Sequence, residues 1–112
     1  MAGITKRSFD APDEDLPLGE KAAGARVTVG GLNVKKASFE PGWRWTEHVS
    51  TDLCTSRHVG YVTSGRLHVV MENGSEAEIG PGDVVVIEPG HDAWTVDDEA
   101  CVFIDFGDSV RP

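Results

Sequence analysis

The chain has 112 residues, 39% hydrophobic residues and a formal net charge of −9 at pH 7. This length supports one hydrophobic core, and the composition excludes a disordered or fibrous protein. The negative charge argues against nucleic-acid binding, because it repels phosphate. No apolar run approaches the about 18 residues of a membrane span, and the N-terminus lacks the apolar stretch of a signal peptide. We therefore expect a cytoplasmic protein that binds neither nucleic acid nor membranes.

Residues 1–20 are rich in Asp, Glu and Pro and include the run DAPDEDLPLGE. A segment of this composition buries little apolar surface by itself. We expect residues 1–20 to form an irregular acidic arm and residues 21–112 to form a single barrel domain.

After the arm, short apolar or alternating runs end at Gly, Pro or Asn turn signals. They predict strands at 26–29, 32–39, 43–48, 58–63, 66–71, 76–79, 83–87 and 101–106. Asn73-Gly74 predicts a hairpin, because both residues tolerate positive φ. The β-branched run at 84–87 is typical of a strand packed on both faces. No run keeps helical spacing, so the sequence predicts an all-β sandwich or closed barrel with little or no helix.

Potential metal ligands gather between Gly42 and Gly65, where His48, Cys54 and His58 occur. Neutral imidazole and thiolate are good ligands for Zn, Cu and Fe. The alternative is that the histidines are half-buried strand residues bonded to backbone carbonyls, and that Cys54 is a small core residue.

The remaining histidines and the second cysteine receive different interpretations. His68 alternates with apolar neighbours on a predicted strand, so we expect it to face solvent. Cys101 lies in the alternating run CVFIDF and is expected in the core. His91 is either a further ligand or a loop histidine after a turn.

The segment from 42 to 97 resembles the two sequence motifs of the cupin superfamily. The first, Gly-x5-His-x-His-x3,4-Glu-x6-Gly, aligns its first His with His48, its second His with Cys54 and its Glu with His58, with an insertion between the first two. The second, Gly-x5-Pro-x-Gly-x2-His-x3-Asn, places Ala93 at its His position. His91 lies two residues earlier, on the same face of an extended strand, and can replace it.

This resemblance implies a cupin-type β-barrel, also called a jelly roll or double-stranded β-helix. It also implies a site inside the barrel, with His48, Cys54, His58 and His91 as ligands of one divalent transition metal (Zn, Fe, Cu or Ni). Small cupins that resemble this chain pair as homodimers through N-terminal arms and sheet edges, so a homodimer is expected here.

Trp94, after His91, and Tyr61 are the expected pocket residues. Trp43 and Trp45 are expected in the core or a dimer interface. Three functions stay open: a metal-dependent enzyme acting on a small organic substrate, a non-catalytic module that binds or senses a small ligand with a closed metal site, and a barrel without metal.

Overall fold

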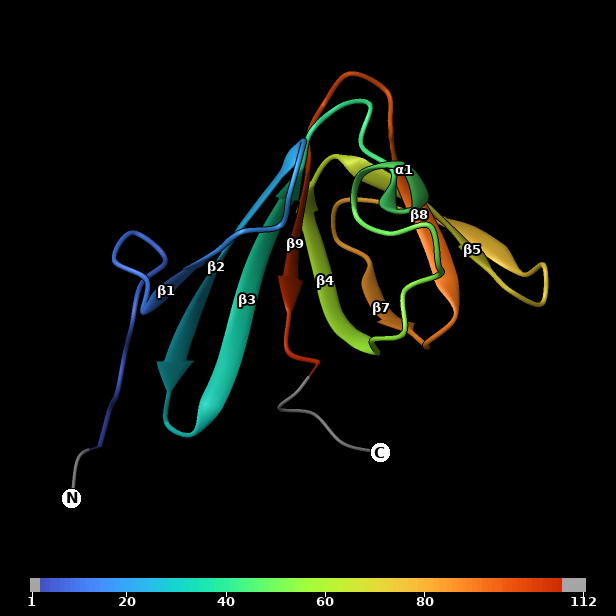
Figure 1. The fold of residues 1–112 in the computed structure, drawn as a ribbon. Helices are drawn as coiled ribbons and strands as arrows, with labels where there is room; N and C mark the ends of the chain where they lie inside the picture. The colour runs from blue at the N-terminus through green and yellow to red at the C-terminus, as the bar shows by residue number, and fades with distance from the viewer. Residues whose placement is uncertain (1–2, 108–112) are drawn as a thin grey trace.

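The computed structural model describes residues 3–107, which form nine strands and one helical turn (Figure 1). The elements are β1 (Glu14–Leu16), β2 (Ala22–Val29), β3 (Leu32–Phe39), α1 (Trp45–His48), β4 (His58–Ser64), β5 (Arg66–Met71), β6 (Glu76–Ile79), β7 (Val84–Ile87), β8 (His91–Val96) and β9 (Cys101–Asp105). Within this described part of the chain, no helix is long and apolar enough to cross a membrane.

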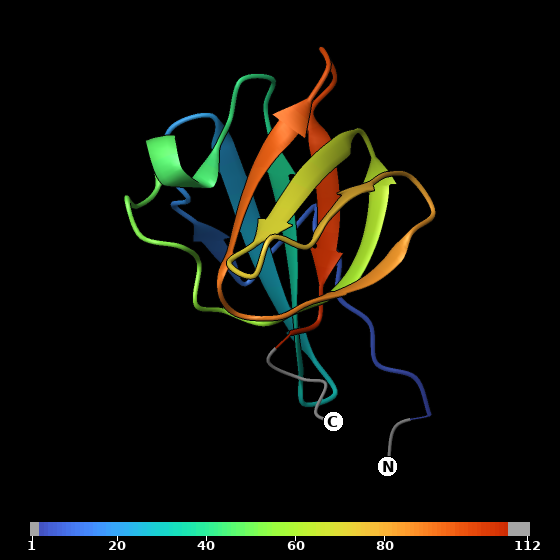
Figure 2. The ribbon, with the colours of Figure 1, turned by 90° about the vertical axis from the view of Figure 1, so that its right-hand side faces the viewer.

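The strands form two antiparallel sheets that face each other. One sheet has six strands in the order β1-β2-β3-β9-β4-β7, and the other has three in the order β6-β5-β8. Figure 2 shows the three-stranded sheet lying against the larger one. The all-β prediction is therefore confirmed, and the predicted hairpin at Asn73-Gly74 joins β5 to β6.

The core lies between the sheets because alternate side chains of each strand point inward. Val62, Cys101 and Phe103 come from the six-stranded sheet, and Leu67 and Val69 face them from β5. Cys101 is fully buried, as its alternating run predicted. Burying the apolar faces of both sheets in one layer is the main stabilising contribution of this fold.

The predicted strand at 43–48 is wrong over most of its length, because residues Trp45–His48 form the helical turn α1. The buried carboxylate of Asp92 on β8 accepts hydrogen bonds from the backbone N–H of Thr46, at 3.1 Å, and from its hydroxyl, at 3.0 Å. The guanidinium of Arg44 forms an ion pair with the same carboxylate at 2.8 Å. These tertiary contacts hold the segment against β8 as a helical turn, although its alternating apolar residues predict a strand.

Two strands were missing from the predicted set. In the arm expected to be irregular, Glu14–Leu16 form β1 and pair with β2, and Glu14 bonds to Arg26. Residues His91–Val96 form β8, which pairs with β5 along its full length.

The prediction that residues 84–87 pack on both faces is also wrong. β7 is an edge strand, and Val84 and Val86 are 83% and 56% exposed. Their register partners on β4 are Tyr61 and Val59, and Tyr61 is itself 41% exposed. This apolar outer face next to an unpaired strand edge is the kind of surface that second copies cover.

The close approach of β4 to β9 requires glycine at position 60. A Cβ atom on Gly60 would overlap the backbone carbonyl of Ile104. Gly60 is the register partner of Asp105, so this contact brings Asp105 beside the start of β4, where His58 lies.

The expected homodimer remains a prediction, and the outer face of β7 is where it is tested. If two copies meet there, light scattering will show a dimer for the wild type and a monomer for the Val84→Asp/Val86→Asp double variant, because charges oppose apolar burial. Leu32→Asp changes an exposed residue at the start of β3 and should leave the dimer intact. A monomeric wild type, or a dimeric double variant, would contradict the prediction.

Candidate metal centre

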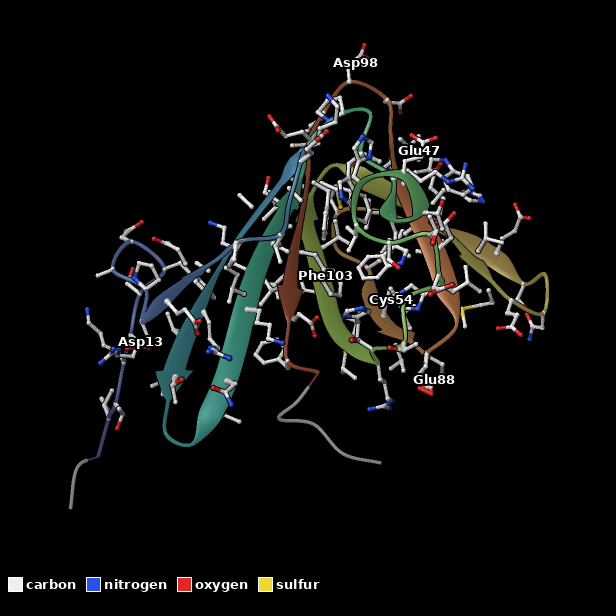
Figure 3. All side chains as sticks on the ribbon, viewed as in Figure 1. Asp13, Glu47, Cys54, Glu88, Asp98 and Phe103 are labelled. Carbon is white, nitrogen blue, oxygen red and sulfur yellow. The ribbon has the colours of Figure 1, made fainter. Side chains whose placement is uncertain are left out.

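Three potential ligands converge at one end of the space between the sheets. The Cys54 Sγ and one ring nitrogen each from His58 and His91 lie within 4.8 Å of one another. Cys54 and His91 are each only 4% exposed, whereas the His58 side chain is 28% exposed. In Figure 3, Cys54 and Phe103 lie toward the middle of the molecule.

Backbone hydrogen bonds bring Cys54 and His91 together although they are far apart in sequence. The Cys54 N–H donates to the His91 carbonyl at 2.8 Å, and the Gly90 N–H donates to the Cys54 carbonyl at 2.7 Å. Gly90 has a φ of 94°, a conformation that glycine adopts without steric cost. The loop before β4 is therefore fixed to the start of β8.

Both imidazole rings are oriented through Nδ1. The Nδ1 atom of His58 lies 2.7 Å from the Asp105 carboxylate, and that of His91 lies 2.7 Å from the Glu88 carbonyl oxygen. Because these oxygens accept, each Nδ1 carries the proton, and Nε2 of a neutral ring is left with its lone pair. The Nε2 of His58 lies 3.6 Å from Cys54 Sγ. Ligand histidines in proteins are commonly held in this way.

The cluster changes the pKa of its members. Burial alone would raise the pKa of the Cys54 thiol, but hydrogen bonds from His58 and His91 outweigh it and lower this pKa to about 5. Burial would lower the pKa of His58, but the hydrogen bond to Asp105 outweighs it and raises this pKa to about 9. Asp105, although desolvated, has its pKa lowered by His58. Without a metal, the cluster thus holds a thiolate beside an imidazolium at neutral pH.

The structure does not bring His48 into this cluster. His48 lies at the end of α1, and its Nδ1 contacts the backbone of Arg44, 3.1 Å from the N atom. Of the four ligands expected from the resemblance, the structure brings together Cys54, His58 and His91 as a group that could hold a metal ion. The helical turn explains the difference, because it folds His48 back onto its own segment instead of along a strand.

The cluster opens on a cavity of about 490 Å³ with mainly apolar and aromatic walls. Trp43, Trp45 and Phe103 line it, but the expected pocket residues Trp94 and Tyr61 do not. Each of those two lies three residues after an inward-facing histidine, and residues three apart on a strand face opposite sides. Trp94 instead stacks on His68, with 4.8 Å between ring centroids.

Asp105 is the residue of the site that the sequence interpretation missed. It follows Cys101 and Phe103 at intervals of two, so the alternation that placed Cys101 in the core also directs Asp105 inward. A carboxylate that points into the core is unfavourable unless it is paired, so an acidic residue at an inward strand position indicates a positively charged partner or a ligand nearby.

These features define an all-β protein whose two sheets enclose an internal site. The family model of the cupin domain matches residues 37–107, and the chain belongs to this family. A search of curated protein sequences found no match.

Solved structures with the same fold include three bacterial proteins. The polyketide cyclase RemF from Streptomyces resistomycificus is 19% identical, with a TM-score of 0.58, and the match covers 80% of this chain and 66% of that one. A cupin-2 domain protein from Rhodospirillum rubrum is 17% identical, with a TM-score of 0.60 and coverages of 91% and 65%. KdgF from Halomonas sp. is 18% identical, with a TM-score of 0.57 and coverages of 87% and 93%. This chain spans slightly under two thirds of the length of the first two.

The donor set suits a transition metal. One thiolate and two imidazoles match the preferences of Zn, Cu, Fe and Ni, and hard ions such as Mg and Ca prefer oxygen ligands. Ligands about 2.0 to 2.3 Å from a tetrahedral ion lie about 3.3 to 3.8 Å from one another. The 3.6 Å between Cys54 Sγ and His58 Nε2 falls in this range. The residues present therefore fit a metal of this class.

The metal-free protein should absorb as a thiolate down to acidic pH. Because the pKa of Cys54 is lowered to about 5 and burial raises that of Cys101 to about 12, Cys54 is the thiol ionised at pH 7. We expect the absorbance at 240 nm to fall as the pH drops through about 5, and to lack this step in Cys54→Ser. A step near 9 instead would contradict the assignment.

Asp105 should strengthen metal binding through His58. In Asp105→Asn, the ring of His58 loses its charged partner, and we expect the affinity for Zn to fall by about 10- to 100-fold in competition with a chelator. Glu88→Gln is the matched control, since Glu88 holds His91 through its backbone carbonyl and its side chain pairs with Arg57. Equal losses in both variants would contradict this role.

Proposed function

We propose that this cupin is a metal-dependent enzyme that acts on a small organic molecule, with Cys54, His58 and His91 holding one divalent transition metal. The observation that carries the proposal is the convergence of three soft or borderline donors at the wall of an internal cavity. Three protein ligands leave a four-coordinate ion one position for water or substrate, which is the pattern of catalytic rather than structural sites.

A bound metal would supply Lewis-acid chemistry, or a place for a substrate oxygen, at the end of the cavity. The protein contributes the geometry around it. Asp105 and the Glu88 carbonyl hold the two rings in position, and Trp43 and Trp45 form part of the apolar wall of the cavity. The cavity volume of about 490 Å³ is in the range typical of small-molecule sites.

The similar structures support an enzymatic role only in a general way. One of them is a polyketide cyclase, so the same fold carries an enzyme in at least that protein. At 19% identity the likeness concerns the fold, and function depends on the site built on it.

A second candidate is a non-catalytic module that binds or senses a small ligand through the metal. Among the described residues that line the cavity, Asp105 is the one carboxylate, and its hydrogen bond to His58 already engages it. The described lining thus holds no second carboxylate to form an acid–base pair with Asp105, which favours binding over catalysis by paired carboxylates.

Elemental analysis of the purified protein tests the metal site. We expect one equivalent of metal per chain in the wild type and less than about a tenth in Cys54→Ala and His58→Ala, since each loses a ligand. His48→Ala and His68→Ala remove histidines outside the cluster and should retain the metal. A metal-free wild type after incubation with Zn, Fe, Cu and Ni would contradict the proposal, as would metal loss in His48→Ala.

The same preparation separates the enzyme from a closed site. In protein loaded with Co(II), azide should shift the visible absorption bands if one position of the metal exchanges ligands. Bands that do not respond to azide would favour the second candidate.

A further inference from the structure

The charged side chains that line the cavity are already engaged within the protein. The carboxylate of Asp105 contacts His58, and the guanidinium of Arg26 bonds to Glu14 on β1. Lys35, which also belongs to the lining, likewise has an interaction partner. In the described part of the chain, the wall therefore presents no uncompensated charge of either sign to a molecule in the cavity.

The metal end of the cavity is balanced as well. The Cys54 thiolate and the Asp105 carboxylate carry two negative charges, and a divalent ion held by the cluster would neutralise both. The imidazoles of His58 and His91 bind a metal in their neutral form. A charged group on the body of a ligand would thus enter apolar surroundings without a counter-charge, which is costly.

The aromatic side chains of the wall add uncharged surface. Phe39 and Trp43 pack with 4.3 Å between their ring centroids, and Trp45 donates its indole N–H to the Asp52 carbonyl at 2.7 Å. The Nε1 atom of Trp43 is buried and has no hydrogen-bond partner among the described residues, and it is an uncharged donor. These rings favour contact with an apolar, flat molecule.

The cavity reaches the surface beside apolar residues. Pro17, which follows β1, and Val49, which follows α1, both line the cavity and are exposed. A Cβ atom on Gly19 would lie 3.3 Å from the His48 carbonyl oxygen, so the segment after β1 lies against the end of α1. A molecule that enters between Pro17 and Val49 thus meets apolar side chains before it reaches the cluster.

We propose that the cavity binds a small molecule with one polar end, which meets the metal, and an uncharged apolar body, which occupies the rest of the cavity. This inference rests on the proposed function, since it names the class of molecule that the same cavity accepts.

The probes share a benzohydroxamic acid, whose head group binds transition metals, and differ in the para substituent of the ring. The para-tert-butyl and para-trimethylammonio compounds have the same shape and differ by one positive charge. The para-isopropyl and para-carboxylate compounds form the corresponding pair for negative charge. Because the head group is constant, the affinity ratio within each pair reports how the cavity treats the body of the ligand.

Binding is measured by calorimetry in Zn-loaded and in metal-free protein. We expect each neutral probe to bind about tenfold or more tightly than its charged analogue. Equal or tighter binding of either charged probe would overturn the inference, and so would the absence of saturable binding by the neutral probes.

Val69 and Val70 on β5 provide a matched pair of positions. Val69 is 6% exposed and lines the cavity, whereas Val70 is half-buried and lies outside the lining. Val69→Thr places a hydroxyl in the apolar wall, so we expect it to weaken binding of the para-tert-butyl probe by about threefold or more. Val70→Thr should leave this affinity unchanged, and an equal loss in both variants would contradict an apolar site at this wall.

A second pair keeps the test valid if Val69→Thr does not fold. Ala37 lines the cavity, and Ala77 on β6 is exposed outside it. Ala37→Leu adds apolar volume inside the cavity and should weaken binding of all four probes, whereas Ala77→Leu should not. Unchanged binding to folded Ala37→Leu would place the probes elsewhere and reject the inference.

Metal content is measured on the same samples, so that the two proposals fail separately. One metal per chain without a preference for the neutral probes rejects this inference alone. A preference for the neutral probes in a protein that takes up no metal rejects the polar end of the ligand class together with the metal-dependent function, and leaves the apolar body.

Discussion

The register between β4 and β9 is the constraint on which the chemistry of this protein depends. Gly60 allows the two backbones to approach more closely than any side chain would permit, and Asp105 is its register partner. That placement brings the Asp105 carboxylate to His58 and fixes which ring nitrogen faces Cys54. A shift of one residue would turn Asp105 to solvent and remove the orientation of the ring.

The cluster concentrates ionisable groups where water is scarce, and such groups are stable only when they compensate one another. In the metal-free protein the positive imidazolium of His58 lies between two negative groups, the Cys54 thiolate and the Asp105 carboxylate. Each negative group stabilises the imidazolium and is stabilised by it, so the pKa of His58 rises while that of Cys54 falls. A divalent cation would take over the role of the imidazolium proton. The same arrangement thus stabilises the empty site and prepares it for a metal.

The cupin framework is retained here with an altered set of donors. The loop between His48 and Cys54 is longer than the family motif, and its backbone pairs with the start of β8 instead of continuing a strand. Asp92, which bonds Thr46 and Arg44, holds the preceding helical turn in place. As a result Cys54 joins the group formed with His58 and His91, and His48 does not.

The sequence by itself determined the all-β class, most of the strands, the burial of Cys101 and the candidate donors Cys54, His58 and His91. These features depend on alternation, turn residues and motif spacing, which are local. Alternation also predicts which way Asp105, Trp94 and Tyr61 face, once β9, β8 and β4 are assigned as strands with Cys101, His91 and His58 pointing inward. Only the tertiary structure decided that residues Trp45–His48 form a turn, that Val84 and Val86 lie on an exposed edge, and that Lys35 lines the cavity. These outcomes depend on which distant strands become neighbours, and that pairing is not encoded in any local pattern.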